Sequence, residues 1–146
     1  MKIIQASQTH IDKLVPLFDG YRIFYKKQSN LEAAKLYLGE RFQKNDSVIF
    51  LALDEKNNGL GFTQLYPSYS SVAMQRTYIL NDLFVSPEAR GQGVGEALMN
   101  KAKEFAVEKG SRGLTLETDH DNPAQKLYTR LGWKKDVAVN HFTWEV

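Results

Sequence analysis

The residues with the clearest chemical potential lie in one glycine-rich turn. The turn contains Arg90, Gly91, Gly93 and Gly95, and it lies between a segment with the pattern of a strand and a segment with the pattern of an amphipathic helix. Glycines at such a turn let backbone N–H groups converge on an anion, and the helix that follows offers unpaired N–H groups at the positive end of its dipole. The guanidinium of Arg90 adds a fork of donors suited to phosphate. The turn therefore predicts a cradle for a phosphate or pyrophosphate.

The two common nucleotide-binding motifs do not fit this turn. A dinucleotide fingerprint requires glycine at the position of Glu96, and a P-loop requires Lys followed by Ser or Thr at Glu96-Ala97. Glycines also occur where a chain only needs a tight turn between a strand and a helix. The glycines alone leave that alternative open.

A second set of candidate groups is acidic. Asn81 and Asp82 interrupt an apolar strand, and alternation along a strand predicts that they point to opposite faces. Glu117 ends the next predicted strand, and Asp119 follows it. Such carboxylates could attract a cation or accept a proton from an amine, directly or through water. The alternative for each of them is an ordinary solvated carboxylate.

Tyrosines supply the remaining candidates. Tyr128 is a possible proton donor because a phenol keeps its proton at neutral pH, although its helical spacing from Ala124 and Leu131 favours simple packing. An aromatic wall for an ammonium group could be formed by Tyr66, Tyr69 and Tyr78.

In their order along the chain, these motifs resemble the GNAT superfamily of N-acetyltransferases. Arg90-x-x-Gly93-x-Gly95 is similar to the coenzyme A signature of that family. The segment Ala124-x-x-Leu127-Tyr128-x-x-Leu131-Gly132-Trp133 is similar to its second block. The strand that carries Asn81 and Asp82 looks most like that of the diamine acetyltransferase branch. The resemblance implies acetyl-CoA as the co-substrate.

The resemblance also implies a role for individual residues. In the family, the glycine turn holds the pyrophosphate, a bulged strand lines the pantetheine arm, and the helix tyrosine protonates the leaving thiolate. Carried onto this chain, the cofactor contacts are Leu83, Phe84, Val85, Arg90, Gly91, Gln92, Gly93, Val94, Gly95, Glu96, Asn122, Ala124 and Tyr128. A bulge is expected to free a backbone N–H near Phe84 or Val85 that polarises the thioester. Asn122 stands one place later than the asparagine often found in the family.

The acceptor side departs from the pattern of the diamine branch. That branch has two adjacent acids in the strand, and the first helps to deprotonate the amine, whereas Asn81 cannot act as a base. We expect Tyr128 and Asp82 to be catalytic, with Glu117 or Asp119 as alternative bases. The expected substrate contacts are Tyr66, Asn81, Asp82, Glu117 and Asp119.

The expected reaction is direct transfer of an acetyl group to a primary amine in a ternary complex. A small cationic diamine or polyamine is the first candidate acceptor. Acetylation of protein amines and a non-catalytic acyl-CoA-binding regulatory module are the alternatives.

Composition narrows the class of protein further. The chain has 146 residues, of which 42% are hydrophobic and 25% charged, and these values predict one domain over residues 1–146. A net charge of +2 gives little reason to expect a nucleic-acid partner, and no apolar run is long enough to span a membrane. Cysteine is absent and the three histidines are dispersed, so we expect no metal and a cytoplasmic protein.

The elements that must position these residues alternate between β and α patterns. Strands are predicted at residues 2–5, 48–53, 60–66, 77–85, 113–117 and 139–146, with residues 67–71 as a loop. Helices are predicted after a capping box at Thr9, at residues 31–42, from Gly95 to Gly110, and from Pro123 to Leu131. With the resemblance, this order implies an α/β, GNAT-like fold with a mixed sheet of about six to seven strands and about four helices. The last strand could complete the sheet or pair across a homodimer.

Overall fold

The structure is a computed structural model that describes residues 1–146. Short 3-10 turns at Gln8–His10 and Pro87–Ala89 precede two of the helices. The helices and strands, in chain order, are β1 (Lys2–Gln5), α1 (Ile11–Phe24), α2 (Leu31–Lys44), β2 (Val48–Leu53), β3 (Gly59–Ser70), β4 (Gln75–Val85), α3 (Val94–Glu108), β5 (Leu114–Thr115) and α4 (Gln125–Arg130).

The five strands form one mixed sheet in the order β1-β2-β3-β4-β5. β1 to β4 are antiparallel neighbours, and β5 runs parallel to β4. The mixed α/β sheet and the four helices confirm the predicted fold, but the predicted number of strands is too high. The difference lies at the C-terminal end, where residues 139–146 form no strand and are exposed. No strand of the sheet pairs with them.

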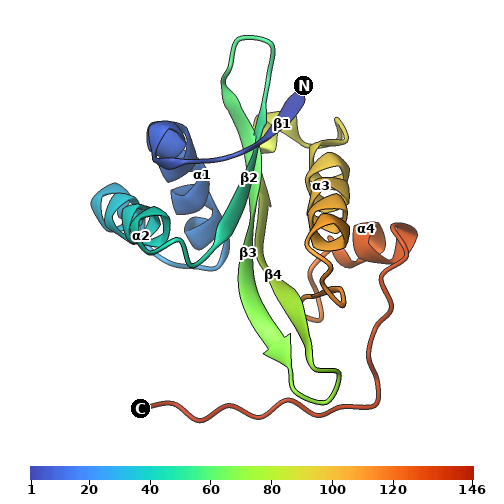
Figure 1. Ribbon diagram of the computed structural model, residues 1–146. Coiled ribbons are helices and arrows are strands. Elements are labelled where there is room, and N and C mark those ends of the chain that lie inside the picture. Colours follow the sequence, from blue (N-terminus) through green and yellow to red (C-terminus); the bar gives the residue numbers. More distant parts are fainter.

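Helices cover both faces of the sheet (Figure 1). α1 and α2 lie on one face, and α3 and α4 lie on the other. One core cluster joins α1 and α2 to Leu51 and Phe62, and the second joins α3 to Phe50 and Leu80. β2 contributes to both clusters, which explains why its sequence is a continuous apolar run without alternation.

Three elements differ in extent from the prediction. β3 continues through Pro67 to Ser70, and the proline is tolerated because β2 pairs with β3 only as far as Leu65. β5 is limited to Leu114–Thr115 because it diverges from β4 beyond that point. The turn before α1 is held by Ser7, whose backbone N–H donates to His10 Nδ1 at 3.0 Å, so the capping box predicted at Thr9 is wrong.

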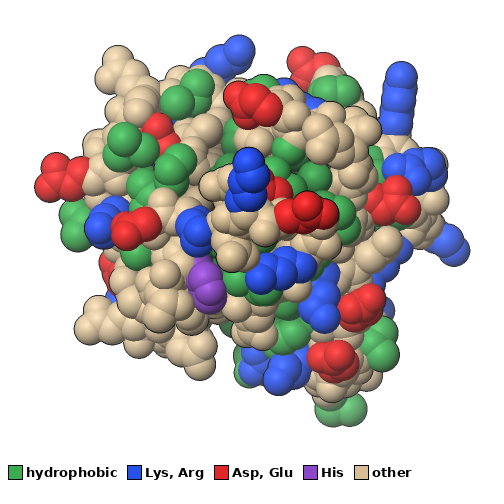
Figure 2. All heavy atoms as spheres, turned by 90° about the horizontal axis from the view of Figure 1, so that it is seen from above, with side chains coloured by type: hydrophobic (Ala, Val, Ile, Leu, Met, Phe, Trp, Pro, Cys, Tyr) green, Lys and Arg blue, Asp and Glu red, His purple; other side chains and the backbone are tan.

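The surface seen from above mixes both signs of charge (Figure 2). Lys and Arg side chains lie among Asp and Glu side chains on this face, and neither sign gathers into a patch. This face therefore presents no concentrated field that would attract a polyanion. None of the helices has the length and apolar character that a membrane crossing requires.

Candidate active site

A cleft opens where β4 and β5 diverge. β5 pairs only with Tyr78 and Ile79, so from Leu80 to Val85 the outer edge of β4 has no partner strand. Residues of β4, α1, α3 and α4 line a cleft of about 260 Å³ beside this edge. A free strand edge can bind an extended ligand that carries amide groups, in the way that a further strand would pair with it.

The glycine turn lies between β4 and α3, next to this cleft. Gly91 and Gly93 adopt left-handed backbone conformations, with φ of +75° and +79°, and a Cβ atom added to either would meet nothing within 4 Å. α3 begins directly after Gly93, and its first turn leaves backbone N–H groups without helical partners. The arrangement fits a pyrophosphate, because the turn is uncrowded around Gly91 and Gly93 and lies at the positive end of a 15-residue helix.

The side chains of the turn mostly serve its shape. Arg90 lines the cleft and donates from Nε to the Val85 carbonyl at 3.0 Å, which ties the turn to the end of β4. Gln92 donates to the Glu88 carbonyl at 3.1 Å, and Glu96 pairs with a side chain of α4 at 2.8 Å. Val94 is buried in the core. Among the predicted contacts, Gln92, Val94 and Glu96 can therefore offer mainly their backbone groups.

α4 forms the opposite wall of the cleft. Tyr128, Ala124 and Asn122 all line it, and Leu127 packs against Gly95 of α3. Asn122 Oδ1 accepts a hydrogen bond from the Ala124 backbone N–H at 2.9 Å, so the asparagine closes a turn and the helix begins at Gln125 instead of Pro123.

Burial raises the pKa of Tyr128, and the nearby Tyr25 hydroxyl raises it further, while Thr118 acts in the opposite direction. The phenol therefore keeps its proton at any pH at which the enzyme would work. A protonated hydroxyl in the wall of the cleft can donate a proton to a leaving group.

The strand that lines the cleft contains a β-bulge at Asn81. The register between β3 and β4 shifts between Gln64 and Leu65, so Asn81 has no partner residue on β3. The strand thus has the expected bulge, but the bulge does not free an N–H group at Phe84 or Val85, because those residues pair regularly with β3. Their free side is the cleft edge of the strand, where both line the cleft.

The bulge also changes how Asn81 and Asp82 relate to each other. An extra residue breaks the alternation of side chains along a strand. Asn81 Nδ2 consequently donates to Asp82 Oδ1 at 2.8 Å, although simple alternation predicted opposite faces. Asn81 lines the cleft, whereas Asp82 is 2% exposed and is not among the lining residues.

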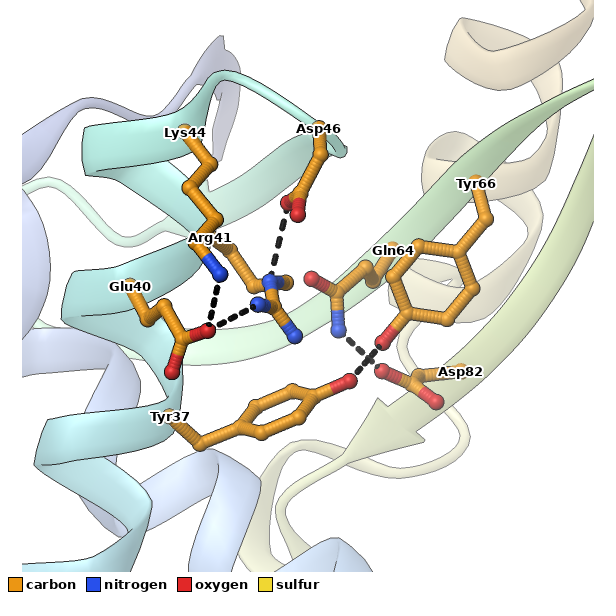
Figure 3. Close-up of polar contacts among 8 residues, drawn as sticks. All are labelled: Tyr37, Glu40, Arg41, Lys44, Asp46, Gln64, Tyr66 and Asp82. Atoms are coloured by element: carbon orange, nitrogen blue, oxygen red, sulfur yellow. Dashed lines mark hydrogen bonds and ion pairs between the residues drawn. The ribbon is translucent and has the colours of Figure 1, made fainter.

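Asp82 belongs to a polar cluster between the sheet and α2 (Figure 3). Gln64 Nε2 donates to its carboxylate at 2.5 Å, and the Tyr66 and Tyr37 hydroxyls lie 2.6 Å apart beside it. Burial raises the pKa of Asp82, although its hydrogen bonds to the amide side chains act in the opposite direction. Tyr66, a predicted substrate contact, is thus held in this cluster and does not line the cleft.

α1 supplies an aromatic wall that the sequence analysis missed. Tyr21, Phe24 and Tyr25 line the cleft, and the rings of Tyr21 and Tyr25 meet edge to face at 5.1 Å. The Tyr21 hydroxyl donates to the Asn81 carbonyl at 3.2 Å. Their i, i+3, i+4 spacing on one helical face was the available signal.

α1 can approach the sheet closely because of a glycine. A Cβ atom at Gly20 would lie 2.9 Å from the Phe84 ring, so only glycine fits here without a shift of that ring. The contact sets the aromatic residues of α1 directly opposite β4.

Of the remaining predicted substrate contacts, one lines the cleft and the other does not. Glu117 lines the cleft, whereas Asp119 does not, although its charge helps to raise the pKa of Tyr25. Tyr69 is 70% exposed and Tyr78 is buried against Phe105, so neither forms the aromatic wall.

An enzyme that takes an acyl group from a coenzyme A thioester requires an anion cradle, a partner for an amide-bearing arm and a proton donor near the sulfur. The cleft between β4 and α4 combines these three features, and its residues fit such a co-substrate. The class defined by fold and site is that of the acyl-CoA-dependent acyltransferases.

Comparison with known proteins identifies the family. Residues 14–133 match the Acetyltransferase (GNAT) family. An uncharacterized N-acetyltransferase of Bacillus subtilis, YhfO, is 44% identical over 143 residues, which are 97% of this chain and 95% of that one. A crystal structure of a probable acetyltransferase superposes with a TM-score of 0.94 at 42% identity, covering 100% of this chain and 98% of the other.

A shorter part of the chain is similar to an enzyme whose name states its substrate. The bovine thialysine N-epsilon-acetyltransferase is 39% identical over 74 residues, which are 50% of this chain and 43% of that protein. The chain belongs to the GNAT acetyltransferase family, which confirms the predicted family, and it is an acetyl-CoA-dependent acetyltransferase.

Proposed function

We propose that the protein transfers the acetyl group of acetyl-CoA directly to a primary amine of a small cationic molecule, in a ternary complex. The observation that carries the proposal is the composition of the cleft. The same cleft is lined by Arg90 and Gly95 at the glycine turn, by the rings of Tyr21, Phe24 and Tyr25, and by Glu117. Aromatic faces and a carboxylate together favour an ammonium group over a neutral or anionic acceptor.

When bound, acetyl-CoA supplies an activated thioester carbonyl. The backbone of the turn at Gly91–Gly95 and the Arg90 side chain would hold its pyrophosphate, and the free edge of β4 would pair with its amide-bearing arm. N–H groups on that edge, near Phe84 and Val85, can stabilise the negative charge that develops on the carbonyl oxygen. Tyr128 then protonates the departing sulfur.

The amine must lose a proton before it attacks. Glu117 is the carboxylate in the cleft and accepts that proton through water. Asp82 reaches the cleft only through its neighbours: Asn81 bonds to it, and its charge adds to the effect of burial in raising the pKa of Tyr21. We therefore assign Asp82 a positioning role: it holds Asn81 and Tyr21 in place.

A diamine of the kind that the diamine acetyltransferase branch uses is the first acceptor that we propose. The partial match to a thialysine acetyltransferase supports this choice, because thialysine is itself a cationic amino compound. Protein amines are the second candidate.

The test follows thiol release from acetyl-CoA over a panel of diamines, amino acids, aminoglycosides and lysine-containing peptides. Because the chain has no cysteine, every thiol above the enzyme-free blank is released coenzyme A. We expect turnover with the small diamines. Turnover with peptides alone would replace the small-molecule acceptor with a protein amine. Binding of acetyl-CoA without turnover on any acceptor would contradict the proposed acceptors and favour a regulatory module.

Further proposals concern the state of the protein. We propose that residues 1–146 act as one domain, that the protein works in the cytoplasm and that it forms a homodimer. The absence of cysteine supports a reducing compartment. The exposed apolar side chains near the C-terminus support self-association.

A further inference from the structure

Part of the cleft wall is a phenylalanine ring that has no room to retreat. Phe84 lines the cleft, and its side chain packs against the core cluster of α1 and α2. The tip of the ring faces Gly20 of α1, where even one added Cβ atom would lie 2.9 Å from it. The Arg90 guanidinium carbon lies over the same ring, 5.7 Å from its centre. The backbone of α1 therefore blocks movement of the Phe84 ring toward that helix.

Tyr21 forms the neighbouring part of the wall and is held as firmly. It lines the cleft from α1, and its hydroxyl donates to the Asn81 carbonyl at 3.2 Å. Its ring meets Tyr25 edge to face at 5.1 Å and Phe62 edge to face at 6.1 Å. Close-packed side chains give little space to an added group, because any shift disturbs contacts on several sides.

The orientation proposed for the thioester directs its acyl group toward these two rings. In the proposed complex, the carbonyl oxygen lies at the free edge of β4 and the sulfur lies toward Tyr128 on α4. The three groups on a carbonyl carbon point apart in one plane, so the acyl chain must leave on the third side. Because α1 and α4 lie on opposite faces of the sheet (Figure 1), that third side is the one that α1 covers.

We infer that Phe84 and Tyr21 close the cleft at the acyl group and make the enzyme select acetyl over longer acyl chains. This inference rests on the proposed function, which orients the thioester, and it adds the side chains that set the permitted chain length. Gly20 acts through Phe84, because it brings the α1 backbone against the ring. In a close-fitting apolar pocket, one methylene group changes specificity by about 10–200-fold.

Calorimetry with acetyl-CoA and butyryl-CoA tests the inference without an acceptor. We expect the natural protein to bind butyryl-CoA at least about tenfold more weakly than acetyl-CoA. Phe84→Ala should remove most of this difference, because deletion of the ring makes room for the longer chain. A loss common to both ligands, such as one caused by the lost contact with Arg90, cancels in the ratio of the two Kd values. Equal binding by the natural protein, or an unchanged ratio in Phe84→Ala, would overturn the inference.

Leu83→Ala is the matched control. Leu83 precedes Phe84 on β4 and also lines the cleft, but its side chain packs against the cluster on the α3 side of the sheet. We expect the ratio of the two Kd values to stay that of the natural protein, whatever the change in affinity for both ligands. An equal change of the ratio in Leu83→Ala and Phe84→Ala would mean that the whole cleft had loosened, which contradicts a specific role for Phe84.

Gly20→Ala tests the same contact in the opposite direction. The new methyl group meets the Phe84 ring and displaces it toward the cleft, so acetyl-CoA itself should bind about tenfold more weakly. The same substitution added to Phe84→Ala should leave acetyl-CoA binding unchanged, because no ring remains to be displaced. An equal loss with and without the ring would contradict the role given to Gly20.

Turnover shows whether the preference extends to catalysis. Thiol release with one amine of the acceptor panel gives kcat/KM for both acyl-CoA compounds. We expect the butyryl-to-acetyl ratio of kcat/KM to rise at least about tenfold in Phe84→Ala, as the binding ratio does. Absence of turnover with every amine would count against the proposed function alone, because the binding ratios do not depend on an acceptor.

Discussion

Tyr128 is the residue on which the proposed chemistry depends most directly. Burial raises the pKa of its hydroxyl, so the proton donor persists through neutral and alkaline pH. A general acid of this kind contributes about 10²–10⁴-fold to a rate. We expect Tyr128→Phe to lower kcat by about 10²-fold or more, with acetyl-CoA affinity unchanged in calorimetry. Tyr69→Phe, at an exposed tyrosine outside the cleft, is the control and should keep full activity.

Asp82 gives a prediction for stability against pH. Its pKa is raised in the folded protein by burial, so the folded state binds this proton more tightly than the unfolded chain does. The associated stabilisation is complete below the unfolded pKa, near 3.9, and is lost as pH rises through the folded pKa. Each unit between the two pKa values is worth about 1.4 kcal/mol.

Asp82→Asn removes this titration. We expect the free energy of unfolding of the variant, relative to the natural protein, to rise between pH 4 and pH 8 in urea titrations. Gln64 Oε1 is buried without a partner and can accept from the new amide, so the substitution can be accommodated. A difference that stays constant with pH would show that the Asp82 pKa is not raised.

At the residue scale, the sequence predicted the residues that lie in motifs and missed those that tertiary packing brings in. Arg90 and Tyr128, both singled out from motifs of fixed spacing, line the cleft. Tyr21 lies 60 residues before Asn81 in the chain, yet its hydroxyl donates to the Asn81 carbonyl. No local sequence pattern encodes this contact. The bulge at Asn81 is equally invisible, since it depends on the pairing register with β3.

At the element scale, the turn before α3 is proposed to bind the pyrophosphate through its backbone, and glycine substitutions can test this proposal. Alanine in a left-handed conformation costs about 1–2 kcal/mol wherever it occurs. Gly93 and Gly110 both have left-handed φ and open space at Cβ, but Gly93 precedes α3 and Gly110 follows it. We expect both alanine variants to lose about 1 kcal/mol of stability in urea titrations.

Only Gly93→Ala should weaken acetyl-CoA binding, by about tenfold or 1.4 kcal/mol, because its new methyl group points into the space proposed for the pyrophosphate. Calorimetry on both variants measures this difference. Equal affinities would mean that the pyrophosphate binds elsewhere and that the glycines only shape a turn.

The bounds of β2 were predicted correctly, whereas those of β5 were not. Residues 48–53 match β2, because an apolar run in the centre of a sheet has few alternatives. β5 is shorter than predicted because its divergence from β4 creates the cleft, and the sequence of residues 113–117 carries no sign of that divergence. The place where the sheet departs from regular strand pairing is thus the candidate active site.

At the scale of the whole molecule, the main difference from the prediction is that residues 139–146, expected to form a strand within the sheet or across a dimer, form no strand in the single chain. The alternation that suggested a strand is real, but a sequence pattern does not say which chain provides the partner. Self-association through the exposed apolar side chains of this segment, as in the proposed homodimer, would join the unfolding of each chain to dissociation of the dimer.

Linked dissociation has a measurable consequence. Because a folded dimer is favoured by mass action, its unfolding temperature should rise with protein concentration, whereas that of a monomer should not. We expect a rising Tm for the natural protein over a hundredfold range of concentration and a constant Tm for Trp144→Asp. Acetyl-CoA should raise the Tm of both, by the equivalent of about 2.7 kcal/mol at 100 times its Kd, because the cradle and the cleft lie within one chain. Loss of the acetyl-CoA effect in Trp144→Asp would instead show that the co-substrate site needs the tail of the second copy.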